Sequence, residues 1–174
     1  MNVMGSLKNT FNFAVKMKYF IPMIITDGAI LGFVSASSTH LLPDDHYNKI
    51  QAGIFLVFVG AGSIIGGFLS GLFSDKFPIM KVGKSSFLFL GIGIFLSLPL
   101  FMKLIENLVY SYFLGFVWGF VWHYMDGWLW VICSKIFNGR LESFALNKFL
   151  HSLSFVIYQF VLILYGTGNN LMFI

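Results

Sequence analysis

Residues Gly60–Lys84 read GAGSIIGGFLSGLFSDKFPIMKVGK, and the rest of the chain can be interpreted outward from them. The first part of this stretch is apolar and contains two pairs of glycines, each pair spaced four residues apart. Residues at that spacing lie on one face of a helix, and small residues on such a face let a neighbouring helix approach closely in lipid. The stretch therefore predicts a membrane helix that packs through Gly62 and Gly66, and through Gly67 and Gly71.

The composition of the 174-residue chain is typical of a membrane protein: 57% of its residues are hydrophobic, 10% are charged, and its mean hydropathy is +0.83. In soluble domains, about a quarter of the residues are charged. We expect one membrane domain over residues 1–174, with the lipid bilayer as a partner. The basic residues fall mostly between apolar runs, which indicates membrane topology and no nucleic-acid partner. Cys133 is the single cysteine, so an internal disulfide is excluded.

Five apolar runs are long enough to cross a bilayer whose hydrocarbon core is about 30 Å thick. We therefore predict an all-α, polytopic membrane helix bundle. Residues 1–18 are expected to form a short amphipathic helix or a partly ordered tail, and residues 171–174 look like the first turn of a sixth span. The five predicted spans are approximately Tyr19–Leu42, Ile50–Phe73, Ser85–Leu104, Leu108–Ile132 and Leu146–Tyr165.

The basic residues orient these spans. With the N-terminus in the cytoplasm, nine of the eleven Lys and Arg residues fall in inner segments, and only Lys49 and Lys103 fall in outer segments. Lys and Arg are concentrated on the cytoplasmic side of membrane proteins, so this distribution predicts an integral membrane protein with a cytoplasmic N-terminus. The inner residues are Lys8, Lys16, Lys18, Lys76, Lys81, Lys84, Lys135, Arg140 and Lys148.

A polar segment follows the second predicted span. Gly71 is followed, after three intervening residues, by Asp75 and Lys76, and two more basic residues follow at Lys81 and Lys84. This order resembles the signature loop between the second and third helices of each half of a major facilitator, with a proline where that pattern has its second glycine. The resemblance implies that Asp75 contacts a neighbouring helix and holds one gating state. An ordinary cytoplasmic basic loop is the alternative.

The fourth and fifth predicted spans carry a more specific pattern: Trp118-Gly119, Asp126, Phe144-Ala145 and Ser152-Leu153, in that order. The first span begins near Phe20-Ile21-Pro22 and ends near Thr39-His40-Leu41. The pattern of the fourth and fifth spans resembles the tenth and eleventh helices of the "uncoordinated ninety-three" family, a branch of the major facilitators named for proteins that regulate ion channels. The start and end of the first span are similar to the family's seventh helix. The resemblance implies one half of a major facilitator, from its seventh helix to the start of its twelfth.

Three ionisable side chains inside the predicted spans are candidates for a cavity or for ion coupling. Asp27 lies within the first span, and no Lys or Arg lies in the interior of any span, where it could pair with Asp27. His123 and Asp126 are three residues apart on one helix face, so they can hydrogen-bond and share a proton. In the superfamily the corresponding helices line a central cavity, which implies that these groups face a common space. The alternative is that all three are polar contacts between helices.

Other polar residues indicate packing rather than chemistry. Asn147 and His151 are four residues apart in the fifth span and share a face with Ser154, which predicts a hydrogen-bonding stripe between helices. The histidines and the single cysteine do not fall at metal-ligand spacing, and the sequence contains neither a nucleophile–base pattern nor a phosphate loop. We therefore expect no enzymatic activity, no metal and no cofactor.

Two functions follow from these patterns. The family resemblance implies a non-catalytic regulator or subunit of an ion channel or another membrane complex. The wider superfamily implies half of a secondary transporter for a small solute or ion, with proton coupling through the buried acids. Major facilitators join two six-helix halves, so we expect another membrane protein or a separate second half as a partner, or else a chain that is a fragment. The lack of an intramembrane Lys or Arg and of a complete sixth span favours the regulator.

Overall fold

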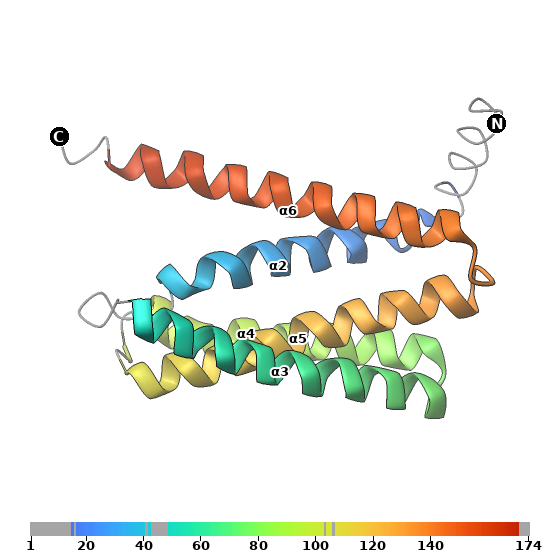
Figure 1. The fold of residues 1–174 in the computed structure, drawn as a ribbon, viewed down its shortest axis with the longest axis horizontal. Coiled ribbons are helices and arrows are strands. Elements are labelled where there is room, and N and C mark those ends of the chain that lie inside the picture. Colours follow the sequence, from blue (N-terminus) through green and yellow to red (C-terminus); the bar gives the residue numbers. More distant parts are fainter. Residues whose placement is uncertain are drawn as a thin grey trace. The chain divides into compact units, whose positions relative to one another are not determined.

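The structure is a computed structural model, and it describes residues 15, 17–40, 42, 49–102, 104–105 and 107–170. The described residues form five α-helices and no strand, so the predicted all-α class is confirmed (Figure 1). Except for Val15, Met17 and Lys18, the expected amphipathic segment lies outside the described residues, as does the expected start of a sixth span. Each predicted run corresponds to one helix: α2 (Ile21–His40), α3 (Lys49–Lys76), α4 (Ile79–Phe101), α5 (Leu108–Lys135) and α6 (Leu141–Asn170).

Helix α4 begins six residues earlier than predicted, at Ile79. Only Phe77 and Pro78 separate it from α3, and Pro78 occupies its N-cap position with φ of −55°. Lysine has a high helix propensity, and proline suits the start of a helix because its φ is already close to the helical value. Lys81 and Lys84 therefore lie in the first two turns of α4 and not in the basic loop that the sequence predicts.

A tight turn joins α5 to α6. Asn138 and Gly139 have φ of 54° and 63°, a left-handed region that glycine adopts freely and asparagine tolerates. The backbone N–H of Gly139 donates to the Cys133 carbonyl oxygen at 3.2 Å. This bond satisfies one of the carbonyls left without a helical partner at the end of α5. The turn lets α6 begin at Leu141, five residues before the predicted span.

Helices α3 and α4 are each long and apolar enough, by length and composition, to cross a membrane. A shorter apolar stretch, Ile21–Ala36, lies in α2. Helices α5 and α6 contain many Trp, Tyr, His, Ser and Asn residues, which lower their hydropathy even though the aromatic rings keep large apolar surfaces. Two of the described helices therefore have the character of membrane spans, and the bundle of five spans stays a prediction.

The chain divides into two compact units. The terminal unit contains residues 1–32 and 133–174, and the central unit contains residues 33–132. The first part of α2 and all of α6 belong to the terminal unit, whereas α3, α4 and most of α5 belong to the central unit. The core of the terminal unit includes Met17, Ile24 and Cys133, whose side chains are almost completely buried.

In the central unit, both α3 and α4 pack against α5. Trp118 and Trp128 of α5 are buried, and their indole N–H groups donate to Ser97 Oγ at 2.9 Å and to the Ile79 carbonyl oxygen at 2.7 Å. A buried tryptophan needs a partner for its single N–H donor, and α4 supplies one near each of its ends. The two indoles therefore fix α4 along the length of α5.

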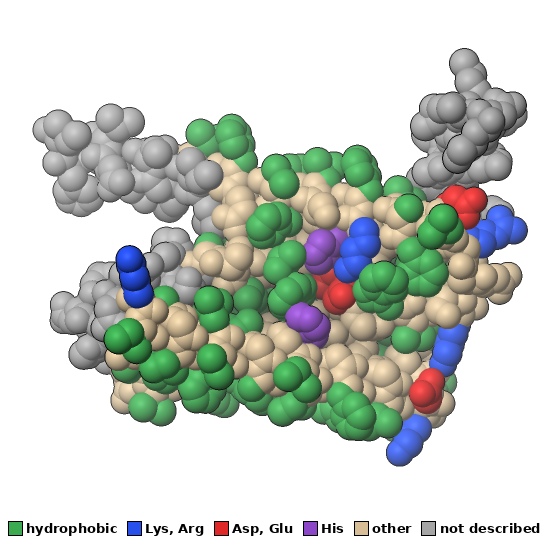
Figure 2. Space-filling view, in the orientation of Figure 1, with side chains coloured by type: hydrophobic (Ala, Val, Ile, Leu, Met, Phe, Trp, Pro, Cys, Tyr) green, Lys and Arg blue, Asp and Glu red, His purple; other side chains and the backbone are tan. Residues whose placement is uncertain are grey.

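The side chains of α3 and α4 are distributed inside out compared with those of a soluble protein. Exposed positions carry large apolar residues: Val57 is 70% exposed, Ile64 75% and Phe95 71%. Figure 2 likewise shows hydrophobic side chains over much of the face in view and few charged ones. Small residues at contacts and large apolar residues outside are typical of helices in lipid. The buried small residues are Gly62, Ser63, Gly66, Ser70 and Ser74 on α3, and Gly83, Ser86, Gly93 and Ser97 on α4.

Candidate functional site

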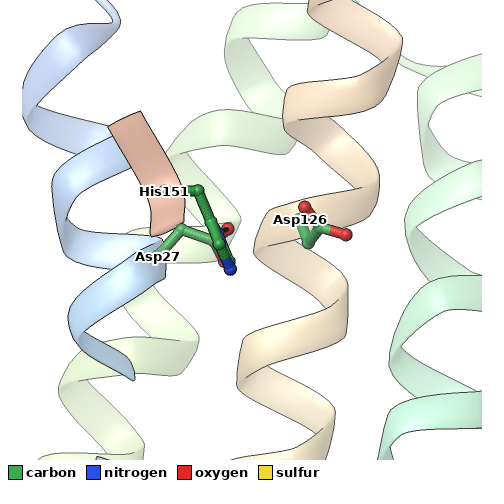
Figure 3. Close-up of side chains that lie close together, drawn as sticks. All are labelled: Asp27, Asp126 and His151. Carbon is green, nitrogen blue, oxygen red and sulfur yellow. Dashed lines mark hydrogen bonds and ion pairs between the residues drawn. The ribbon is translucent and has the colours of Figure 1, made fainter. Parts of the chain in front are cut away.

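The candidate Asp27 lies in a contact between α2 and α6 within the terminal unit. Its side chain is fully buried, and its Oδ2 lies 2.7 Å from Nδ1 of His151 on α6. Figure 3 shows the two side chains meeting from neighbouring helices. In this hydrogen bond the imidazole donates when the carboxyl group is ionised, and the pair can hold a proton between them. Asp27 therefore has an ionisable partner.

Two further hydrogen bonds extend this contact along both helices. Ser154 Oγ donates to the Ile25 carbonyl oxygen at 2.6 Å, and Gln159 Nε2 donates to the Gly32 carbonyl oxygen at 3.0 Å. Partners that lie later in α2 are thus met by residues later in α6, since Asp27 pairs with His151 and Gly32 with Gln159. The two helices therefore run in the same direction.

Asn147 belongs to the same stripe of α6 but differs from His151 and Ser154 in its hydrogen bonding. It lies one turn before His151 and is 1% exposed, and its Oδ1 accepts no hydrogen bond from the described residues. The sequence places Asn147, His151 and Ser154 on one face, and the structure directs His151 and Ser154 to α2. Asn147 is the member of that stripe whose carbonyl oxygen lies buried without such a bond.

Sequence reasoning missed the partner of Asp27, because the search for a partner considered only Lys and Arg. His151 lies 124 residues away in the chain, and nothing local connects the two. A second missed feature is the spacing of Gly28 and Gly32, which are four residues apart. A Cβ on Gly28 would collide with the His151 backbone, and one on Gly32 would collide with the Tyr158 ring. The spacing alone could have indicated this small-residue face.

The contact between α3 and α5 in the central unit is made mainly by glycines. A Cβ on Gly62 would collide with the Phe116 carbonyl oxygen, and one on Gly66 would collide with that of Phe120. Helix α5 contributes its own pair: Gly119 lies against the Val59 backbone, and Gly115 lies against the Phe55 ring. The two backbones therefore come into direct contact. The pair on α5 also has the four-residue spacing, which the sequence reasoning overlooked.

Gly67 and Gly71 differ from the sequence expectation. A Cβ on either would meet nothing within 4 Å among the described residues, and the same holds for Gly53 and Gly60. Because these four residues are spaced by seven, seven and four, they fall along one side of α3. We call Gly53, Gly60, Gly67 and Gly71 the open glycine row. Helix α3 thus has one glycine face against α5 and a second one that α4 and α5 leave uncovered.

The candidates His123 and Asp126 lie in the part of α5 that belongs to the central unit, and both are partly buried. Asp126 Oδ2 accepts a hydrogen bond from the indole N–H of Trp130, one turn further along, at 3.1 Å. The His123 ring lies edge-on to Trp122, with 4.1 Å between the ring centroids. The predicted common cavity with Asp27 stays a prediction.

The residues of the predicted signature loop lie at one end of the central unit. Asp75 and Lys76 are exposed in the last turn of α3, and Lys81 and Lys84 are exposed at the start of α4. The expected loop is thereby reduced to the two residues between the helices. These four charged residues form a polar end next to two strongly apolar helices.

Comparison of the chain with protein-family models, curated proteins and solved structures finds no match in any of the three. The geometry of the helix contacts is therefore the basis on which a function can be argued.

Proposed function

We propose that this chain is a multi-pass membrane protein whose five helices all span the bilayer, with its N-terminus in the cytoplasm. The inside-out distribution of side chains on α3 and α4 supports the membrane location. The directions of the helices support the five spans. If every helix crosses the membrane, alternate helices must run in the same direction, so α3 should be parallel to α5 and α2 should be parallel to α6. Within its own unit, each of these two pairs is parallel.

The described basic residues support the proposed orientation. Lys76, Lys81 and Lys84 lie at the end of the central unit where α3 ends and α4 begins, and Lys49 lies at the opposite end of α3. In the terminal unit, Lys18, Lys135, Arg140 and Lys148 all lie near the start of α2 or around the turn that leads into α6. Each unit therefore has one basic end, as expected for a protein with its basic segments in the cytoplasm.

We further propose that the chain acts as a non-catalytic subunit or regulator of an ion channel or another membrane complex, in the manner of the family and half-facilitator architecture that it resembles. The observation that carries this proposal is the open glycine row of α3. On the same helix, Gly62 and Gly66 take up α5 in backbone contact. In the second row, a Cβ added at any of the four glycines would meet no described residue within 4 Å, and such a row suits an apolar helix of a second polypeptide.

The test compares two glycines on the same helix. Tagged full-length chain is expressed in its own cells, extracted in a mild detergent and separated by native electrophoresis. Wild type is expected to migrate as a defined complex with a second membrane polypeptide. Gly60→Leu should release the chain from this complex without changing its helical content, because Gly60 has open space around it. A wild-type chain that is a stable monomer, or a Gly60→Leu complex of unchanged size, would contradict the proposal.

Gly66 is unsuitable for this test, although its spacing first suggests it. A side chain at Gly66 would collide with the Phe120 backbone, so Gly66→Leu would disturb the contact between α3 and α5 itself. It serves instead as a folding control: loss of the complex in Gly66→Leu should be accompanied by loss of folded protein, whereas loss in Gly60→Leu should not.

The alternative function, half of a proton-coupled secondary transporter, is favoured by the buried Asp27–His151 pair. Ionisable groups inside membrane helices are costly and often mark proton pathways. The chain is reconstituted into vesicles that contain a pH-sensitive dye and is exposed to mixtures of small solutes and ions. Transport predicts solute-dependent acidification that Asp27→Asn abolishes while the protein stays folded. The subunit proposal predicts no acidification by the chain alone.

A further inference from the structure

A cluster of lysines lies where α3 ends and α4 begins in the central unit. Lys76 is the last residue of α3, and Lys81 and Lys84 lie in the first two turns of α4; all three side chains are exposed. Residues 75–84 contain these three lysines and one acidic residue, Asp75, so their net charge is +2. We call residues 75–84 the basic turn, and its charge is complementary to that of an anion.

The two lysines of α4 are placed where their charges repel each other. Lys81 and Lys84 are three residues apart, which makes them neighbours on one face of the helix, and like charges so close together destabilise a helix. The first turn of α4 has no acidic residue to offset them, whereas α6 has Glu142 in its first turn, two residues after Arg140. An anion held between the ammonium groups of Lys81 and Lys84 would remove this repulsion.

Exposed apolar side chains surround these lysines. Met80 is 60% exposed and Phe87 50%, and they lie four residues before and three residues after Lys84 on the same face of α4. Phe77, between the two helices, is also 50% exposed. A lysine on an apolar face packs its methylene groups along that face and keeps its ammonium group in polar surroundings. Helical side chains lean towards the N-terminus of their helix, so Lys81 and Lys84 lean towards the start of α4.

A surface of lysines set among exposed aromatic and aliphatic side chains matches the boundary between lipid headgroups and acyl chains. At that boundary, positively charged groups meet phosphate while apolar groups enter the hydrocarbon. A soluble acidic partner would satisfy only the lysines and would leave Phe77, Met80 and Phe87 in water. Because α3 and α4 have the character of membrane spans, the basic turn that joins them lies at the membrane surface if both helices cross the bilayer.

We propose that the basic turn binds the headgroup of an anionic phospholipid. The ammonium groups of Lys81 and Lys84 flank the lipid phosphate, Lys76 adds a third positive charge, and Phe77 and Met80 lie among the first carbons of the acyl chains. The inference rests on the proposed membrane location. Each lysine near a membrane surface favours anionic over neutral lipid by a factor of roughly five, so the net charge of the turn should give a preference of at least about ten-fold.

The test measures this preference at two matched positions. The full chain, with the buried Cys133 replaced by alanine, carries a bimane on Leu88→Cys, one turn after Lys84, or on Val57→Cys, at a similar depth from the opposite end of α3. Both native side chains are exposed. The chain is placed in phosphatidylcholine vesicles, and nitroxide-labelled phosphatidylserine or phosphatidylcholine is added as the quencher. At position 88 half-quenching should need about ten-fold less phosphatidylserine than phosphatidylcholine, and at position 57 the difference should be no more than about five-fold.

Equal quenching by the two lipids at position 88 would overturn the headgroup proposal and leave the membrane location intact. Absence of quenching by either lipid at both positions would overturn both. Inorganic phosphate should lower the preference no more than chloride does at equal ionic strength. A larger effect of phosphate would identify a soluble anion as the occupant of the basic turn and would overturn the lipid.

Charge variants provide the controls, and because the substituted side chains are exposed, their helical content should be unchanged. Lys84→Gln should lower the preference at position 88 about five-fold, and Asp75→Asn should raise it by a similar factor. Lys49→Gln, at the opposite end of α3, should leave it unchanged. Lys81→Gln repeats the test if Lys84→Gln does not fold. An unchanged preference in folded Lys84→Gln or folded Lys81→Gln would overturn the proposal.

Discussion

The contact between α3 and α5 and the contact between α2 and α6 both join helices that run in the same direction, but they use different chemistry. In the first, paired glycines bring two backbones together, and Ser63 Oγ donates a hydrogen bond to the Gly119 carbonyl oxygen at 3.3 Å. Nearer the start of both helices, the Tyr112 hydroxyl donates to Oε1 of Gln51. In the second, His151, Ser154 and Gln159 each hydrogen-bond to α2. The contact between α3 and α5 therefore depends mainly on close backbone packing, and the contact between α2 and α6 depends mainly on side-chain hydrogen bonds.

The two designs should respond differently to mutation. Backbones in direct contact have no side chain that can move aside, so one added methyl group displaces a whole helix. A row of separate hydrogen bonds loses its members one at a time, and in membrane proteins each bond contributes about 0.6 kcal/mol on average. The glycine contact should therefore fail at a single substitution, whereas the polar contact should weaken in steps.

The largest effect is expected at the glycine contact. Gly62→Ala should lower the free energy of unfolding by about 2–3 kcal/mol, because the new Cβ would collide with the Phe116 backbone. Gly60→Ala, two residues away in the open glycine row, should raise it by up to about 1 kcal/mol through helix propensity alone. Unfolding in mixed detergent micelles, followed by circular dichroism, measures both. Similar effects of the two substitutions would mean that the backbones do not touch.

An intermediate effect is expected at the buried pair of the polar contact. His151→Ala should cost about 1–2 kcal/mol, because it leaves the Asp27 carboxyl group buried without its imidazole partner. Asp27→Asn should stay close to wild type, since an amide can still hydrogen-bond to the ring and carries no charge to desolvate. The same unfolding assay applies. If Asp27→Asn proves the more damaging of the two, the carboxylate charge itself is required for stability.

The smallest effect is expected at the outer bonds of the polar contact. Ser154→Ala should cost about 0.6 kcal/mol, because it removes the bond to the Ile25 carbonyl oxygen. Ser152→Ala, on the exposed side of α6, is the matched control and should have no measurable effect. A loss at Ser154 as large as that at Gly62 would show that the polar contact is as cooperative as the glycine contact, and the distinction between them would disappear.

Much of the fold can be predicted because it depends on local properties of the chain. Each helix follows from a long apolar run, and the packing of Gly62 and Gly66 agrees with what their spacing leads one to expect. The start of α4 was predicted less accurately, because lysines near the end of a helix are equally compatible with a loop and with the first turns of the helix. The pairing of Asp27 with His151 could not be predicted either, because histidine can remain neutral and gives no sign of its partner.

The sequence by itself determined five helices, the grouping of basic residues between apolar runs, and two glycine pairs on α3, because helix formation, charge and face depend on residues a few positions apart. Only the tertiary structure decided that Gly62 and Gly66 meet α5 while Gly60 and Gly67 stay open, and that Asp27 meets His151. Judged from nearby residues alone, the two glycine faces of α3 are equally able to pack against another helix. Which face is covered depends on the glycines at Gly115 and Gly119, which the chain brings to α3 from more than fifty residues away.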